Sequence, residues 1–96
     1  MTTPRRAIAL CEPDTDIDEL VERYNLEVVH NAYISGHSVH APTIAALHIA
    51  DHRADVVIAP DLTRALVRES QRWQAITVAA DIVTSDGLVE YAPLAP

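Results

Sequence analysis

Short apolar runs, separated by segments of helical periodicity, are the feature that most constrains the fold of this chain. Residues 7–11 (AIALC) form a continuous apolar run, and three more runs follow at 26–34 (LEVVHNAYI), 56–58 (VVI) and 88–92 (LVEYA). Runs of this length are typical of strands, and an uninterrupted apolar run suits a strand covered on both faces. The sequence therefore predicts four strands.

The segment between the first two runs has the pattern of an amphipathic helix. Its apolar residues fall at i, i+3, i+4 and i+7, namely Ile17, Leu20, Val21 and Tyr24. Asp16 and Glu19 have the spacing of a capping box, and Asp14 is a second candidate for the N-cap. We therefore expect a strand, a loop and a helix at the start of the chain.

Further helices are predicted after the second and third runs. An alanine-rich helix is expected over about 41–52, where Pro42 is tolerated in the first turn. A turn or two of helix is expected after Pro60, and a longer helix over about 70–85, with Gly87 suited to the position after its end. The apolar residues of this longer helix lie at helical spacing, and they are Trp73, Ile76, Ala80 and Val83.

Alternation of strands with helices predicts βαβ units, and these build a parallel sheet through right-handed crossovers. The 96 residues suffice for one compact core. We predict a single α/β domain spanning 1–96: a small, doubly wound, mostly parallel four-stranded sheet with helices on both faces.

Charge narrows the range of partners. The formal net charge is −7, and all seven basic residues are arginines. Affinity for nucleic acids and anionic membranes depends on basic side chains, so we expect binding to neither by the chain on its own. No segment has the length and apolarity of a membrane span, and we expect a cytoplasmic protein. The single cysteine, Cys11, lies in an apolar run and is predicted to be a buried, reduced thiol.

Polar side chains follow the first and third predicted strands, at the carboxyl edge where α/β sheets bind ligands. Glu12 and Asp14 follow the first strand, and Asp61, Thr63 and Arg64 follow the third. Glu12, Asp14, Asp61 and Arg64 therefore make a candidate ligand site. Carboxylate oxygens suit magnesium. The favoured alternative is that Asp14 and Asp61 cap helices while Glu12 is solvated, with Arg64 paired to one of the three carboxylates.

Histidines offer a second candidate for metal binding. His48 and His52 lie one helical turn apart, a spacing that suits zinc if Asp51 or one of the loop histidines, His37 and His40, supplies a third ligand. Such pairs also arise by chance, and the glutamate that follows the first histidine in helical metalloproteases is absent here. We expect neither a metal nor a cofactor. With two glycines, the chain also lacks a phosphate-binding glycine loop.

Three segments resemble the catalytic domain of the serine recombinases, the resolvase and invertase family. RRAIALCEPDTD is similar to its opening strand, ADVVIAPDLTRAL to its third strand and the arginine motif that follows, and WQAITVAADIVTSDGLVEY to its later helix and fourth strand. Aligned in this way, the family's first arginine falls on Glu12, its nucleophilic serine on Asp14, and its Asp/Ser-Arg pair on Thr63 and Arg64. Only Arg64 matches, and the second arginine of that motif falls near Val67 or Arg68.

The resemblance implies a domain without recombinase chemistry. The family attacks a DNA phosphodiester with the serine and stabilises the transition state with arginines. Carboxylates at Glu12 and Asp14 replace both the nucleophile and a phosphate-binding cation, and the family's dimerisation helix and DNA-binding domain have no counterpart before Pro96. We expect an inactive, resolvase-like domain that acts through contacts with a protein partner or with its own copies, in a regulatory or mobile-element-associated role. The alternative is a metal-dependent hydrolase or phosphotransfer protein that uses the strand-end carboxylates.

Overall fold

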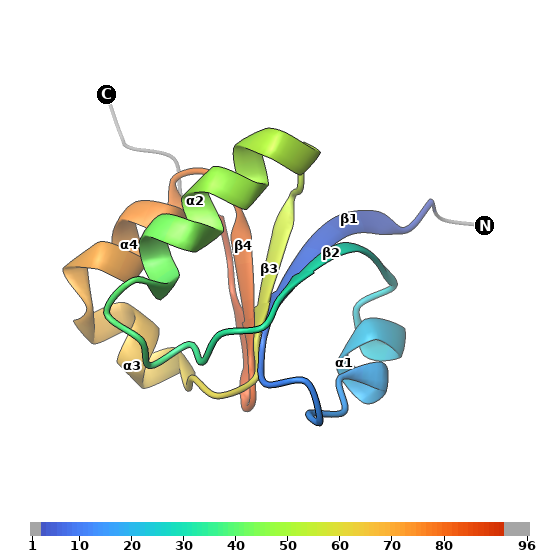
Figure 1. Cartoon of the computed structure of the whole chain (residues 1–96), viewed down its shortest axis with the longest axis horizontal. Coiled ribbons are helices and arrows are strands. Elements are labelled where there is room, and N and C mark those ends of the chain that lie inside the picture. The colour runs from blue at the N-terminus through green and yellow to red at the C-terminus, as the bar shows by residue number, and fades with distance from the viewer. Residues whose placement is uncertain (1–2, 92–96) are drawn as a thin grey trace.

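The computed structural model describes residues 3–91, and this part of the chain contains five strands and four helices. The strands are β1 (Arg5–Leu10), β2 (Leu26–Ala32), β3 (Val56–Ala59), β4 (Asp81–Thr84) and β5 (Gly87–Val89). The helices are α1 (Asp18–Arg23), α2 (Ala41–His52), α3 (Arg64–Glu69) and α4 (Gln71–Thr77). One sheet lies between α1 on one face and the other three helices on the opposite face (Figure 1). The predicted α/β class, with helices on both faces, is confirmed.

The sheet has the strand order β2-β1-β3-β4-β5. Strands β1 to β4 are parallel to their neighbours, and β5 is antiparallel to β4. The prediction of four strands is therefore corrected to a mixed sheet of five within residues 3–91. The segment predicted as the fourth strand, 88–92, overlaps β5, which ends at Val89; residue 92 lies outside the described residues.

The additional strand lies where the sequence predicted the end of a helix. Ala80 and Val83 are three residues apart, which suits a helix, but α4 ends at Thr77 and Val83 lies in β4. All four residues of β4 are buried, and the strand pairs with both β3 and β5. β-Branched residues favour a strand between two others, where they pack on both faces of the sheet. Gly87 begins β5 rather than following a helix.

Two apolar layers hold the helices against the sheet. In β1, Ala7 and Ala9 belong to the layer beneath α1, whereas Ile8 and Leu10 belong to the layer beneath α2, α3 and α4. Cys11 continues the α1 layer and is 4% exposed, which confirms the predicted burial of its thiol. Within residues 3–91, no helix has the length and apolarity needed to traverse a bilayer.

Candidate functional site

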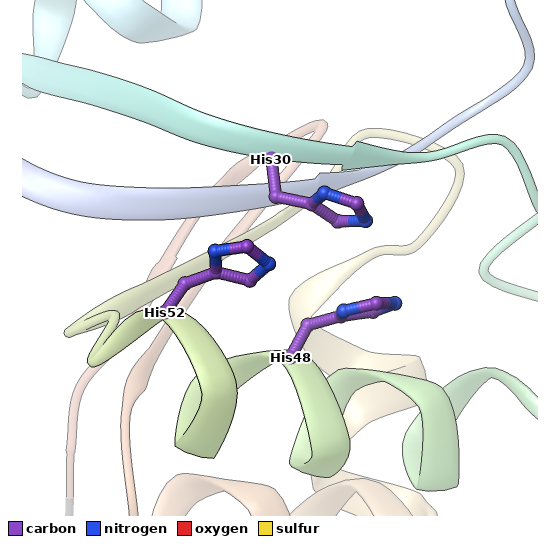
Figure 2. Close-up of side chains that lie close together, drawn as sticks. All are labelled: His30, His48 and His52. Atoms are coloured by element: carbon purple, nitrogen blue, oxygen red, sulfur yellow. The ribbon is translucent and has the colours of Figure 1, made fainter.

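Three histidines converge between the edge strand β2 and helix α2. His30 comes from β2, and His48 and His52 come from α2 (Figure 2). The His30 ring centroid lies 4.2 Å from that of His48 and 4.6 Å from that of His52, and the two α2 rings are 5.8 Å apart. One ring nitrogen of each residue lies within 4.8 Å of the other two. Among the residues that the structure describes, this histidine cluster is the one group of three or more metal-ligating side chains close enough to share an ion.

A β-bulge in β2 brings His30 to the side of the sheet where α2 lies. Ala7 pairs with Val28 but the next residue, Ile8, pairs with His30, so that Val29 is the extra residue on β2. Because side chains alternate along a strand, an uninterrupted β2 would place His30 on the same face as Val28, which packs in the α1 layer. The bulge reverses this alternation, and His30 faces α2 together with Ile8.

Helix α2 supplies the other two rings through its own periodicity. Residues four apart on a helix lie on the same face, one turn above each other, which places His48 and His52 side by side. Both lie toward the carboxyl end of α2, which ends at His52. The last turn of a helix carries partial negative charge because its carbonyl groups lack partners within the helix. This end of α2 therefore favours a cation.

The protonation state of His30 also suits a metal. Burial lowers the pKa of His30 below its ordinary value of 6.5, and the neighbouring His48 and His52 lower it further, while Asp51 opposes the shift. The neutral form of imidazole is the form that binds metal ions. Nδ1 of His48 is buried and has no hydrogen-bond partner in the described part of the chain. A buried nitrogen of this kind costs about 1–3 kcal/mol, which a metal–nitrogen bond would remove.

The geometry fits a transition-metal ion after a small closure of the rings. Tetrahedral zinc with Zn–N distances near 2.0–2.1 Å places its nitrogen ligands about 3.3 Å apart. The three ring nitrogens lie within 4.8 Å, so side-chain rotations that move each pair by at most about 1.5 Å are sufficient. Three protein ligands leave a fourth position for water or another ligand, as in catalytic zinc sites.

Among the residues predicted at the carboxyl edge of the sheet, Arg64 contacts a partner that was not expected. Arg64 was expected to pair with Glu12, Asp14 or Asp61, and this is corrected: its Nε lies 3.9 Å from the carboxylate of Asp86, in the β4–β5 turn. The Arg64 backbone N–H also donates to Asp86 Oδ1 at 2.9 Å. This pairing follows from the presence of β4, whose turn to β5 ends next to the start of α3.

The other polar residues at this edge serve local structure. Asp61 Oδ2 lies 3.4 Å from the backbone nitrogen of Gly36, which donates to it. Thr63, rather than Asp61, caps α3, because its Oγ1 accepts the Leu66 N–H at 3.2 Å. The expectation that Asp61 caps this helix is therefore wrong. Glu12 is exposed, as was expected of a solvated side chain.

The start of α1 also differs from the prediction. The N-cap position is Ile17, which forms no side-chain capping bond, and Asp16 Oδ1 instead accepts the N–H of Asp18 at 2.9 Å. Asp14 is exposed and lies four residues before the helix, so it does not cap α1. The sequence predicted the N-cap at Asp14 or Asp16, before the observed position, because several acidic residues near the helix start have the spacing expected of an N-cap.

His30 was not predicted to be a member of the histidine cluster. Its strand was predicted, and the His48–His52 pair was recognised, but the third ligand was sought at Asp51 or in the loop containing His37 and His40. Strand alternation assigns His30 to the opposite face from α2, and the bulge that reverses this assignment has no marker such as glycine in VVHN. No protein family model, curated protein or solved structure matches this chain.

Proposed function

We propose that this protein binds a transition-metal ion through His30, His48 and His52. The observation that carries the proposal is the convergence of three imidazoles from two separate elements. One of them, His48, has a buried nitrogen without a hydrogen-bond partner among residues 3–91. Three neutral nitrogen ligands suit zinc, cobalt, nickel or copper, whereas magnesium and calcium require oxygen ligands. The proposal departs from the expectation of no metal, because that expectation did not include His30.

Such an ion would connect the edge strand β2 to α2. β2 has β1 as its partner on one side, and its other side is an edge of the sheet. A metal bound to His30 and to the two α2 histidines adds a cross-link between these elements in the folded state. Since the unfolded chain lacks the assembled site, the binding free energy adds to the stability of the fold.

A thermal-melting titration of the untagged protein with zinc tests this proposal. An ion held at a hundred times its dissociation constant adds about 2.7 kcal/mol, which in a domain of this size raises the Tm by about ten degrees or more. Magnesium at the same concentration should leave the Tm unchanged. His30→Asn should abolish the zinc-dependent rise, while His37→Asn, in an exposed loop, should preserve it.

Two results would refute the metal site. One is a Tm that none of zinc, cobalt, nickel and copper raises. The other is a rise that His30→Asn leaves intact, because binding would then occur elsewhere on the protein. Isothermal titration calorimetry of the same variants provides the stoichiometry, which should be one ion per chain.

A second candidate function, favoured by a different surface, is the inactive recombinase-like domain that acts through protein contacts. An apolar groove of about 230 Å³ lies between the loop after β2 and the helices α3 and α4. Trp73 and Leu62 line it, and the exposed side chains of Val39 and Leu66 stand at its margin, 63% and 41% exposed. We propose a second copy of this chain as the occupant.

Charge complementarity supports that choice. Among the described residues, Arg72 lines the groove and no acidic residue does. Six of the 14 acidic residues fall within residues 12–22. Three of them, Asp18, Glu19 and Glu22, lie in α1, which covers the opposite face of the sheet from α3 and α4 (Figure 1). Copies that meet through these two unlike surfaces would associate head to tail.

Sedimentation velocity over a concentration series tests the second candidate. At low salt the wild-type protein should associate, and Leu66→Asp and Arg72→Glu should each remain monomeric. High salt should weaken association because the attracting charges are exposed. A wild-type chain that stays monomeric at millimolar concentration would rule out this self-association, whatever the result with metals.

A further inference from the structure

Arg6 connects the first strand of the sheet to the end of the helix that carries two of the three histidines. Its guanidinium donates two hydrogen bonds to the backbone carbonyl oxygen of His52, from Nε at 3.0 Å and from Nη2 at 2.8 Å. Its third nitrogen, Nη1, lies 3.9 Å from the carboxylate of Glu27 in β2. One side chain thus contacts both elements that supply imidazoles.

The contact with His52 acts on a group that helix geometry leaves without a partner. The last carbonyl groups of a helix have no N–H donor within the helix. The planar fork of an arginine binds such an oxygen with two donors, which fixes direction as well as distance. The backbone of Arg6 adds a second attachment, because its carbonyl oxygen accepts the N–H of Asp55 at 2.8 Å. The end of α2 and the residues that follow it are therefore attached to β1.

The third histidine is placed by the same strand. Ile8, two residues after Arg6 and on the same face of β1, pairs with His30 across the bulge. β1 is consequently a common support for His30 and His52. Its backbone sets the position of His30, and the Arg6 side chain sets the position of His52.

We infer that Arg6 is a positioning residue for the metal centre, an inference that rests on the proposed metal-binding function. It holds the carboxyl end of α2 at the distance from β2 at which the three imidazoles can share one ion. Groups that orient metal ligands contribute about 10- to 100-fold to metal affinity. The positive charge of Arg6 opposes a cation, but its side chain is 47% exposed, so water and salt screen the repulsion. The positioning effect should therefore dominate.

Zinc affinity measured by competition with a chromophoric chelator tests the inference on Arg6→Gln, Arg6→Lys and a matched control, Arg5→Gln. Arg5 precedes Arg6 and pairs with Asp81 at 2.7 Å, so its substitution also removes an arginine contact. We expect Arg6→Gln to bind zinc about tenfold more weakly than wild type. Arg6→Lys keeps the charge but loses the two-donor fork, and it should also be weakened. Arg5→Gln should differ from wild type by less than about twofold.

Cobalt absorption supplies a readout that a purely structural role would not change. Tetrahedral cobalt absorbs more strongly in the visible range than cobalt of higher coordination number, so its spectrum reports the arrangement of the imidazoles. Arg6→Gln should alter the cobalt spectrum. Arg5→Gln should reproduce the wild-type spectrum, even if its metal-free Tm falls as much as that of Arg6→Gln. Wild-type affinity and spectrum in Arg6→Gln would overturn the inference and leave the metal site standing. A wild-type protein that binds neither zinc nor cobalt would overturn both.

Discussion

Arg64 was predicted to belong to a ligand site, but in the structure it contacts a neighbouring turn instead. It lies at the start of α3, and both its backbone and its side chain contact Asp86 in the β4–β5 turn. Asp86 also accepts a hydrogen bond from Thr84 Oγ1 at 2.9 Å. The hydrogen bond from the Arg64 backbone, and then that from Thr84, lower the pKa of Asp86 below its ordinary value of 3.8. Asp86, Thr84 and Thr63 therefore stabilise the β4–β5 turn and the start of α3.

Arg64→Ala should therefore cost less stability than the loss of a core side chain. The Arg64 and Asp86 side chains are 46% and 50% exposed, and exposed ion pairs contribute about 0–1 kcal/mol. Val57 in β3 is fully buried, so Val57→Ala should cost about 2 kcal/mol through lost burial and a cavity. Urea denaturation of both variants measures the difference. A loss for Arg64→Ala equal to that for Val57→Ala would mean that the pair is stronger than its exposure implies.

The lowered pKa of His30 predicts that the stability of the metal-free protein depends on pH. Its pKa is lowered in the folded state, so the unfolded chain binds the proton more readily, and stability rises with pH. The contribution is present above the ordinary value of 6.5 and is lost as the pH falls below it, toward the lowered folded value. Wild type should therefore melt at a lower temperature at pH 5 than at pH 7.5 when a chelator is present.

His30→Asn should reduce this difference in Tm, since asparagine does not titrate. His40→Asn is the matched control, because it removes a loop histidine outside the cluster. Equal pH dependence in wild type and His30→Asn would contradict the assigned origin of the effect.

Two local features of the sheet determine the direction of His30 and the orientation of β5. One is the bulge in β2, which redirects His30 toward α2. The other is the tight turn between β4 and β5, in which Thr84 pairs with Gly87 and its Oγ1 lies 2.7 Å from the Gly87 carbonyl oxygen. This turn makes β5 antiparallel and places Asp86 beside α3.

Gly87→Ala should destabilise the β4–β5 hairpin. Gly87 has a φ of +144°, a conformation that residues with a side chain rarely adopt, and a Cβ there would lie 3.2 Å from Arg64 Cδ. The expected loss is about 1–3 kcal/mol, measured by urea denaturation. Ser85→Ala, in the same turn, removes one hydrogen bond to Leu62 O and should cost about 1 kcal/mol. A Gly87→Ala protein as stable as wild type would show that the turn has another conformation.

The molecule as a whole is an acidic three-layer domain. A single short helix, α1, covers one face of the sheet, while α2, α3 and α4 cover the other (Figure 1). The net charge is −7, and the seven arginines are spread over β1, α1, the residue after α2, α3 and α4. Non-specific attraction to an anionic polymer requires a concentrated basic surface.

We therefore predict that the protein does not bind duplex or single-stranded DNA at physiological salt. Fluorescence anisotropy with labelled oligonucleotides should show no binding at micromolar protein. Salt-sensitive binding at micromolar or tighter affinity would contradict this prediction, and it would favour recombinase chemistry over an inactive domain.

Much of the fold could be predicted because it depends on short-range pattern. The strands β1 and β3 were predicted from short apolar runs, α2 from its alanine-rich composition, and the burial of Cys11 from the apolar run that contains it. β4 could not be separated from the helix before it, because the segment AADIVT is compatible with the periodicity of a helix and with that of a strand. Only its pairing with β3 decides in favour of the strand. Two of the three residues of the candidate site could be predicted, because the spacing of His48 and His52 is local to one helix.

The sequence by itself determined the alternation of strands and helices, and therefore the class of the fold. Tertiary structure alone decided that the sheet has a fifth, antiparallel strand in its described part, that Arg64 contacts Asp86, and that His30 meets His48 and His52. The physical reason is the range of the interactions. Periodicity and helix spacing are properties of neighbouring residues, whereas the bulge at Val29 is set by how β2 pairs with a strand some twenty residues earlier in the chain. Only that pairing directs His30 toward α2 and assembles the histidine cluster.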